Sequence, residues 1–424
     1  MNTLPDSLTR PDGSVTNYAY DNIFRLSSIT NLNSLNQTLT SNSFVYNNAN
    51  MRTKETVFNN VSAVLGNSTK TYSYNNLNQL TNSGYAYDAD GNMTSGYTPD
   101  GYAFTAQYDA ENRLTSISYT DANNVTHTAS FIYSADNMIA KQIIDGVETR
   151  FVRDTNFNVL QERDSTNTVT RSYVWDSIAP GGIGGLLELT QNGQQYDYLY
   201  DGKGNVSAVI DANQNVVASY AYNPFGRLLA KSGTLDQPYQ FSTKYYYPGY
   251  GILYYGYRFY NPTCMKWMTR DPSGEDGGLN LYLAMLNNLI NIMDELGLNP
   301  VDLQKMVEWI DDNANTYSTG QCARYVRLAI EAGGGDTTGH PIYAKDWGTT
   351  LQRIGFNPVS AGAKFGDIVV IQPPPNDIAG HIEIYDGSRW VSDFFQRDFW
   401  PGPSYRKFKP SYQMYRQPDS TCNN

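Results

Sequence analysis

The chain has 424 residues, of which 35 are tyrosine and 35 are glycine, while only 17% carry a charge. This length is sufficient for two or more domains with a substantial core. The net charge of −11 argues against nucleic acid as the main partner, because a phosphate-binding protein needs a basic face. Abundant aromatic residues among Asn-, Gly- and Thr-rich stretches predict many short strands and tight turns rather than disorder.

The cysteines and the apolar segments exclude several protein classes. Cys264, Cys322 and Cys422 lie far apart and are odd in number, so neither a disulfide framework nor a zinc site is predicted. No metal and no cofactor is expected. No apolar run reaches the length of a membrane span, and the first residues lack the pattern of a signal peptide. We therefore expect synthesis in the cytoplasm, with any action elsewhere depending on a separate delivery route.

Residues 1–250 repeat a short pattern that begins with tyrosine and ends with an aliphatic residue. Between these two lie Asp or Asn, two variable positions, Gly or Asn, and a polar residue. Asp, Asn and Gly supply the turn of a β-hairpin, and the flanking tyrosine and aliphatic residue can pack on one face. The uneven spacing of the copies favours a stacked or spiralling sheet over a closed propeller. The copies begin at Tyr20, Tyr74, Tyr87, Tyr108, Tyr200 and Tyr222.

These copies resemble the YD repeats of Rhs proteins and of Tc-toxin shell subunits. The stretch GILYYGYRFYNPTCMKWMTRDPSGEDGGLNLYLAMLNNLINIMDELGL, residues 251–298, resembles the Rhs core-associated segment. The resemblance implies a mainly β shell that spirals around a C-terminal effector. It divides the chain into a YD-repeat segment at 1–250, the core-associated segment at 251–298 and a toxin domain at 299–424.

The same resemblance implies that the chain cuts itself between Leu298 and Asn299. The aspartate pair thought to act in the family falls on Asp271 and Asp294. Two carboxylates that share one proton can serve as acid and base toward a peptide carbonyl. The sequence departs from the family pattern at its end, where DELGL replaces the usual DPLGL. In the alternative interpretation, the two aspartates are only turn and cap residues.

A second candidate site begins in the stretch YSTGQCARYVRLAIEAGGG. Ser318 and Gln321 fit the capping-box pattern, which predicts a helix that begins at Ser318 and ends at the glycines from Gly333. Cys322 then falls in the first turn, where unpaired N–H groups and the positive end of the helix dipole favour a thiolate. Cys322 is accordingly predicted to be a nucleophile, and the alternative is a small buried core residue.

The candidate base and its orienting acid follow on two predicted strands, HIEIY and RWVSDF, joined at an Asp-Gly dipeptide. A two-residue turn at this dipeptide would place His381 opposite Ser392, and a shift by one residue would place it opposite Asp393. Asp393 is therefore the predicted residue that orients the imidazole. Glu383 lies on the same strand face as His381 and is the rival orienting group.

The motifs GQCARYVRLAI, FGDIVVI and GHIEIY together resemble the NlpC/P60 and CHAP classes of papain-like hydrolases. The resemblance implies an α+β fold and hydrolysis of amide bonds, usually in peptidoglycan stem peptides. Carried over, Cys322 is the nucleophile, His381 the general base and Asp393 the orienting residue. Backbone N–H groups at the helix start, aided by Gln321, would meet the oxyanion.

Three hypotheses of function follow. The first is an antibacterial effector that hydrolyses peptidoglycan in the periplasm or cell wall of a target cell. Its partners would be a cognate immunity protein and either a type VI secretion apparatus or the remaining Rhs shell. The second hypothesis is a cysteine protease or deamidase that acts on a protein of the target cell. The third is a non-enzymatic YD-repeat surface protein that binds glycans, in which Cys322→Ala would leave activity intact.

Overall fold

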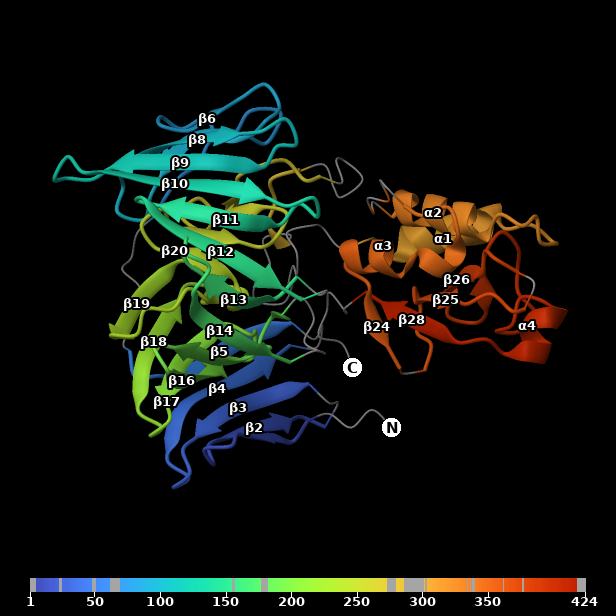
Figure 1. Cartoon of the computed structure of the whole chain (residues 1–424), viewed down its shortest axis with the longest axis horizontal. Helices are drawn as coiled ribbons and strands as arrows, with labels where there is room; N and C mark the ends of the chain where they lie inside the picture. The colour runs from blue at the N-terminus through green and yellow to red at the C-terminus, as the bar shows by residue number, and fades with distance from the viewer. Residues whose placement is uncertain are drawn as a thin grey trace.

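The computed structural model shows two bodies, a larger β body and a smaller α+β body (Figure 1). The structure describes residues 5–22, 25–47, 51–61, 69–154, 157–176, 182–272, 280–285, 301, 303–333, 335, 337, 340–360, 362–375 and 377–417. We call the described residues from 5 to 285 the shell segment and those from 301 to 417 the tail. Among the described residues, no helix combines the length and apolar character that a membrane crossing requires.

The shell segment is built from antiparallel strands that pair with their neighbours in the chain. One sheet has five strands in the order β1 to β5, and a second has fourteen in the order β6 to β19. The five are β1 (Ser7–Thr9), β2 (Val15–Tyr20), β3 (Leu26–Leu32), β4 (Thr38–Tyr46) and β5 (Arg52–Phe58). The fourteen are β6 (Ala86–Tyr87), β7 (Met93–Tyr97), β8 (Ala103–Tyr108), β9 (Leu114–Thr120), β10 (Thr126–Tyr133), β11 (Ile139–Ile144), β12 (Val147–Arg153), β13 (Val159–Arg163), β14 (Val169–Trp175), β15 (Leu186–Gln191), β16 (Gln194–Tyr200), β17 (Val206–Asp211), β18 (Val216–Tyr222) and β19 (Leu228–Gly233).

The repeated sequence closes the turns between these strands, as its composition predicts. In the copy that begins at Tyr108, Asp109 Oδ1 accepts the N–H groups of Glu111 and Arg113, each at 3.0 Å. Asn112 takes a φ of 60°, in the left-handed region that Asn tolerates. The same bond to the N–H four residues on is made by Asp21, Asn75, Asp88, Asp201 and Asn223.

The tyrosines of the repeat tie successive strands together through their hydroxyl groups. Tyr108 donates to the carbonyl oxygen of Met93 at 2.8 Å, and Tyr222 donates to that of Val206 at 3.0 Å. Met93 and Val206 are the aliphatic residues that end earlier copies of the pattern. Tyrosine therefore packs its ring in the core and also satisfies a backbone carbonyl, which explains why the repeat uses it instead of phenylalanine.

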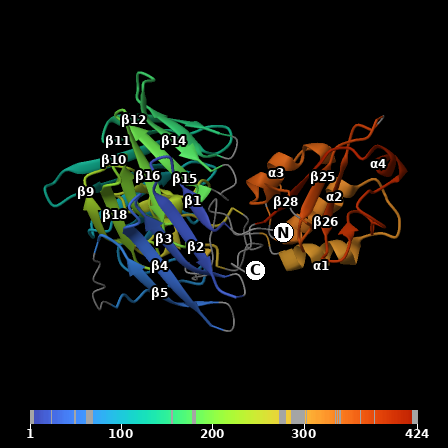
Figure 2. The ribbon, with the colours of Figure 1, turned by 90° about the horizontal axis from the view of Figure 1, so that it is seen from below.

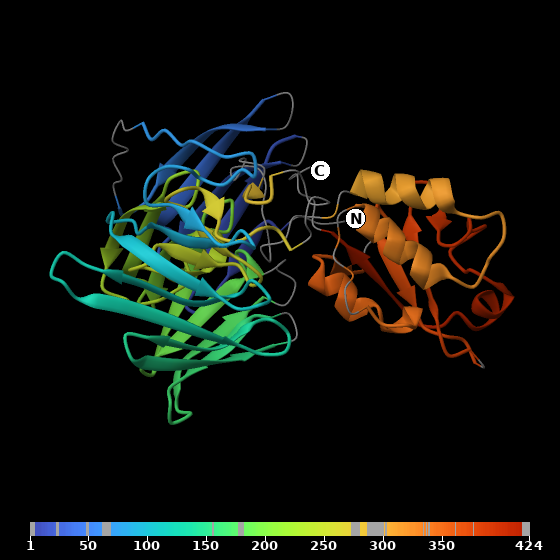
Figure 3. The same ribbon diagram turned by 90° about the horizontal axis from the view of Figure 1, so that it is seen from above.

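The face enclosed by the fourteen-stranded sheet is occupied by the chain's own residues. A four-stranded sheet comprises β20 (Tyr245–Tyr247), β21 (Ile252–Tyr254), β22 (Phe259–Asn261) and β23 (Lys266–Trp267). Buried Ile252, Phe259 and Met268 of this region pack in one cluster with Phe104 and Ile117 of the large sheet. Figure 3 shows the same arrangement from above, with the tail lying beside the shell segment. In this structure the shell segment therefore does not enclose the tail.

The tail is a small α+β body with a five-stranded antiparallel sheet in the order β24-β28-β25-β26-β27. Its strands are β24 (Asn357–Val359), β25 (Ile368–Ile371), β26 (His381–Tyr385), β27 (Trp390–Val391) and β28 (Tyr412–Arg416). Its helices are α1 (Leu303–Asn313), α2 (Cys322–Ala332), α3 (Gly348–Arg353) and α4 (Pro403–Phe408). Helices α1 and α2 cover one face of the sheet and share a core with β25 and β26, as Figure 2 also shows from below.

Two local predictions for the tail are wrong in their boundaries. Helix α2 begins at Cys322 with Gln321 as its N-cap, and no side chain of the expected capping box bonds to the cap. In the hairpin, Tyr385 pairs with Trp390, so the loop spans four residues instead of the two expected. Asp386 Oδ1 accepts the N–H groups of Ser388 and Arg389, which stabilises this longer loop.

Candidate active site

The predicted nucleophile lies at the first position of helix α2. Apolar Val326, Ala329 and Ile330 recur at helical spacing, are fully buried and fix the helix against the sheet. Cys322 is half-buried at the margin of this core. At this position its own N–H is one of the first N–H groups of the helix, which have no acceptor within the helix. The sequence therefore places a thiol and an available backbone donor on the same residue.

The predicted base begins strand β26, and its side chain is almost fully enclosed. His381 is 7% exposed, and its neighbour Glu383, two residues further along the same strand, is fully buried. Glu383 Oε2 lies 3.3 Å from His381 Nε2, and Gln396 Nε2 lies 3.0 Å from the same nitrogen. These two groups share Nε2, and Cys322 also interacts with the imidazole.

Charge at the site favours a protonated imidazole. Burial lowers the pKa of His381, but Cys322 and Glu383 outweigh it and raise that pKa to about 10. Burial likewise raises the pKa of Glu383 to about 7, against the lowering effect of His381. A positive imidazolium held between a sulfur and a carboxylate is the arrangement that a thiolate nucleophile requires. The structure thus brings Cys322, His381 and Glu383 together.

Asp393 has different partners from those that the sequence predicted. Its carboxylate is fully buried, and Oδ2 accepts the N–H of Thr319 at 2.5 Å and that of Gln321 at 3.2 Å. Although burial raises its pKa, these donors lower the pKa of Asp393 below its usual value. The carboxylate thus caps the turn in front of α2, and the rival Glu383 is the acid that contacts His381. The four-residue hairpin loop accounts for the difference, because it shifts the register on which the prediction depended.

Two neighbours of the imidazole escaped prediction from the sequence. Gln396 is buried and also donates to Ser392 Oγ at 2.9 Å. The ring of Tyr405, from α4, lies 6.1 Å from that of His381, and its hydroxyl donates to Asp377 Oδ2 at 3.0 Å. Both residues follow the two-residue strand β27, in a stretch whose sequence has no regular periodicity.

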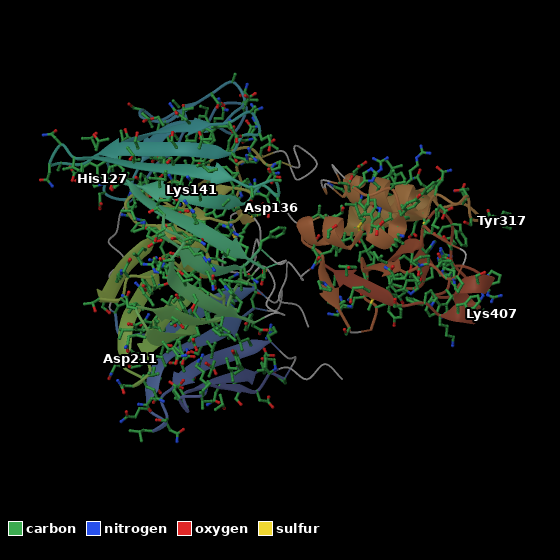
Figure 4. All side chains as sticks on the ribbon, viewed as in Figure 1. His127, Asp136, Lys141, Asp211, Tyr317 and Lys407 are labelled. Carbon is green, nitrogen blue, oxygen red and sulfur yellow. The ribbon has the colours of Figure 1, made fainter. Side chains whose placement is uncertain are left out.

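The remaining predicted helper of this site, Gln321, is exposed. Its side-chain Oε1 accepts a hydrogen bond from Arg324 Nη1 at 2.8 Å, while its backbone N–H is directed at Asp393. The loop that contains Gln321 starts after Tyr317, which points outward at the end of the tail remote from the shell segment (Figure 4). The turn that follows Tyr317 therefore begins away from the shell segment.

Of the residues predicted for self-cleavage, the structure describes Asp271. Its carboxylate is buried, and Oδ2 lies 2.9 Å from Arg258 Nη2, whose side chain is buried as well. Asp294, Leu298 and Asn299 lie outside the described residues. The structure therefore describes one of the two aspartates predicted for this reaction.

Other parts of the described chain offer no comparable set of reactive groups. Nowhere in it do three His, Cys, Asp or Glu side chains gather so that they could hold a metal ion. A cavity of about 630 Å³ lies between β4–β5 and β17–β18, and Glu55, Asp201 and Lys203 are among its lining residues. Both carboxylate oxygens of Asp201 accept hydrogen bonds from Asn205 within a repeat turn. The described lining of this cavity therefore shows no pairing of a nucleophile with a base.

Comparison with known proteins identifies a family for the shell segment. Residues 12–282 match the family described as Teneurin YD-shell. The tRNA3(Ser)-specific nuclease WapA of Bacillus spizizenii is 34% identical over 227 residues, which are 51% of this chain. Those residues are 9% of that relative, so the chain corresponds to a small part of its length.

Two solved structures are also similar. The Photorhabdus luminescens Tc holotoxin pore, with a mutation in TccC3, has a TM-score of 0.50 at 18% identity, covering 69% of this chain and 18% of that one. This similarity concerns the fold alone. The type VI effector–immunity complex Tae3–Tai3 from Ralstonia pickettii has a TM-score of 0.26 and 43% identity, covering 27% of this chain and 98% of that chain.

Proposed function

The chain belongs to the Teneurin YD-shell family, and from this premise we propose that its tail is the toxic part of an antibacterial effector. The proposed activity is hydrolysis of amide bonds in peptidoglycan stem peptides. The observation that carries the proposal is the contact of a helix-borne Cys322 with a buried His381 whose Nε2 faces Glu383. A helix-borne thiol set against a strand histidine is also what the resemblance to NlpC/P60 and CHAP hydrolases implies.

In the proposed reaction, Cys322 Sγ attacks the carbonyl carbon of the substrate amide. The bond from sulfur to carbon forms, and the carbonyl electrons move to oxygen, where the N–H of Cys322 stabilises them. His381 holds the proton taken from the thiol and delivers it to the leaving amine as the carbon–nitrogen bond breaks. Water then attacks the thioester, gives its proton to His381 and releases the free thiol with the carboxylic acid product.

Glu383 has two tasks in this scheme. Its carboxylate sits 3.3 Å from His381 Nε2, so it keeps the orientation in which the ring contacts Cys322. It also stabilises the imidazolium that exists while the proton is on the ring, and it adds to the larger effect of Cys322 in raising the pKa of His381 to about 10. Asp393 holds the helix end and does not take part in proton transfer.

Delivery and release are part of the same proposal. The effector would act in the periplasm or cell wall of a target cell, and the producing cell would be protected by a cognate immunity protein. The similar Tae3–Tai3 structure from Ralstonia pickettii is itself an effector–immunity complex. The tRNA specificity in the name of WapA is a property of that protein, and the residues matched by this chain are 9% of its length.

Self-cleavage between Leu298 and Asn299 would free the tail from the shell segment. Of the two aspartates assigned to this step, the structure describes Asp271, and its buried contact with Arg258 orients the carboxylate. Intact-mass measurement of the purified chain tests this step. The expected products end at Leu298 and begin at Asn299, and Asp271→Asn is expected to leave the chain whole.

The hydrolytic activity is tested by incubating purified bacterial sacculi with the full chain and with its Cys322→Ala variant. Mass spectrometry of the released muropeptides identifies the bond that is cut. Stem-peptide fragments that appear with the parent chain alone support the proposal. Intact sacculi with a folded parent chain would contradict it and favour a protein substrate, or a glycan-binding role without catalysis.

A further inference from the structure

We propose that Gln396, Ser392 and Asp393 are positioning residues that tie the general base to the helix end carrying the nucleophile. The inference rests on the function proposed above for Cys322 and His381, and it goes beyond the acid that faces the ring. These three residues follow β27 and are all buried. Together they form a continuous chain of side-chain hydrogen bonds from the imidazole to the turn in front of α2.

The first link runs from the imidazole to Ser392. Gln396 Nε2 lies 3.0 Å from His381 Nε2 and donates to Ser392 Oγ at 2.9 Å. The amide of Gln396 therefore joins the imidazole and Ser392 through a single side chain.

The second link runs from Ser392 to the helix end. Ser392 Oγ donates to Asp393 Oδ1 at 3.1 Å, and Asp393 Oδ2 accepts from Thr319 Oγ1 at 2.9 Å as well as from two backbone N–H groups. A charged carboxylate only accepts hydrogen bonds, so Asp393 sets the direction of the whole chain. Ser392 must donate to it and is left to accept from Gln396.

A backbone attachment holds the same turn from its other end. The carbonyl oxygen of Asp393 accepts both the backbone N–H of Asn315, at 2.9 Å, and its side-chain Nδ2, at 2.8 Å. Residues 315–321 thus wrap around Asp393 directly before Cys322. The circuit closes because Cys322 follows this turn in the chain and contacts His381 in space.

The circuit matters because strand β27 ends at Val391. Beyond it, the backbone N–H of Gln396 bonds to the carbonyl oxygen of Trp390 at 3.0 Å, and the side-chain bonds then orient the amide toward the imidazole. Displacing a reacting group by about 1 Å can lower the rate by about a hundredfold. A buried polar network also loses stability when one member is removed, because its neighbours are left without partners. Ser392 is the best point to interrupt the circuit, since it bonds on both sides and lies away from the sulfur.

The experiment measures alkylation of Cys322 by iodoacetamide in the full chain, followed by peptide mass spectrometry, between about pH 6 and pH 9. Ser392→Ala is expected to slow alkylation near neutral pH by about tenfold and to change the shape of the pH profile. The matched control is Ser388→Ala in the hairpin loop just before β27, where the serine is exposed and bonds to Asp386. This control is expected to alkylate like the parent chain.

Parent-like alkylation of Ser392→Ala, with an unchanged melting temperature, would overturn the inference. If Ser392→Ala fails to fold, Gln396→Met decides in its place, because it removes the amide at nearly constant volume; its pH profile is then compared with that of the parent. Alkylation needs no substrate. A chain that does not cut sacculi but shows these changes therefore refutes the proposed substrate and leaves the positioning circuit standing.

Discussion

The shell segment and the tail use their polar side chains in opposite ways. In the shell segment, Asp109 bonds to N–H groups two and four residues ahead, and the same local bond recurs from copy to copy. In the tail, Asp393 bonds to N–H groups 74 and 72 residues away in the chain. Bonds within one turn stabilise that copy of the repeat, so the shell segment should tolerate the loss of any one copy. Distant bonds that converge on Cys322 build a single site, which should fail when one member is changed.

The largest contrast is expected between two cysteines. Cys322→Ala should reduce hydrolysis by about 10⁴-fold or more, because it removes the atom that forms the bond, with little change in melting temperature. Cys264→Ala alters a fully buried thiol of the shell segment and should cost about 1 kcal/mol of stability while leaving hydrolysis intact. Muropeptide release and thermal unfolding measure the two effects. Equal activity of the two variants would show that Cys322 is a structural residue.

A smaller effect is expected from the acid that faces the imidazole. Glu383→Gln keeps the shape of the side chain but removes its charge, so hydrolysis should fall by about 10²-fold. The pKa of His381 should also drop below about 10, because one of the two negative neighbours is gone. Proton NMR titration of the histidine ring measures this shift. Glu308→Gln, on the exposed face of α1, is the control, and a shift of equal size in it would contradict the role of Glu383.

The next prediction concerns the acid stability of the tail. The folded-state pKa of Asp393 lies below its unfolded value, so its contribution to stability is present above about pH 4 and is lost as pH falls through the folded pKa. Tryptophan fluorescence of the chain should therefore show an acid transition from the tail. Asp393→Asn should lower stability at neutral pH by about 1–3 kcal/mol and flatten the acid limb. An unchanged acid limb in this variant would assign the transition to other carboxylates.

The smallest effect is expected from one repeat of the shell segment. Tyr108→Phe removes the hydroxyl that donates to the carbonyl of Met93 and should cost about 1 kcal/mol, measured by urea unfolding. Neither the alkylation of Cys322 nor hydrolysis should change. Loss of activity in this variant would mean that the two bodies depend on one another.

The parts that sequence reasoning predicted correctly are those governed by local rules. The repeat turns, strand β25 and the apolar face of α2 follow from turn residues and from periodicity. The start of α2 did not, because Asp393, far away in the chain, binds the N–H groups of Thr319 and Gln321 and holds them in a turn before the helix. The partner of His381 was also misassigned, because a four-residue loop replaced a two-residue turn. Glu383 was the rival candidate in the prediction, because the two-residue period of a strand is enough to place it on the same face as His381.

The position of β28 in the tail sheet has a consequence for the order of synthesis. Strand β28 (Tyr412–Arg416) is the last strand described, yet it pairs with both β24 and β25 in the interior of the sheet. The shell segment pairs each strand with the one just made, so it can fold progressively as the chain leaves the ribosome. The tail sheet cannot close until residue 416 has emerged. A cell making this chain would therefore meet the assembled Cys322 centre only after β28 has been synthesised.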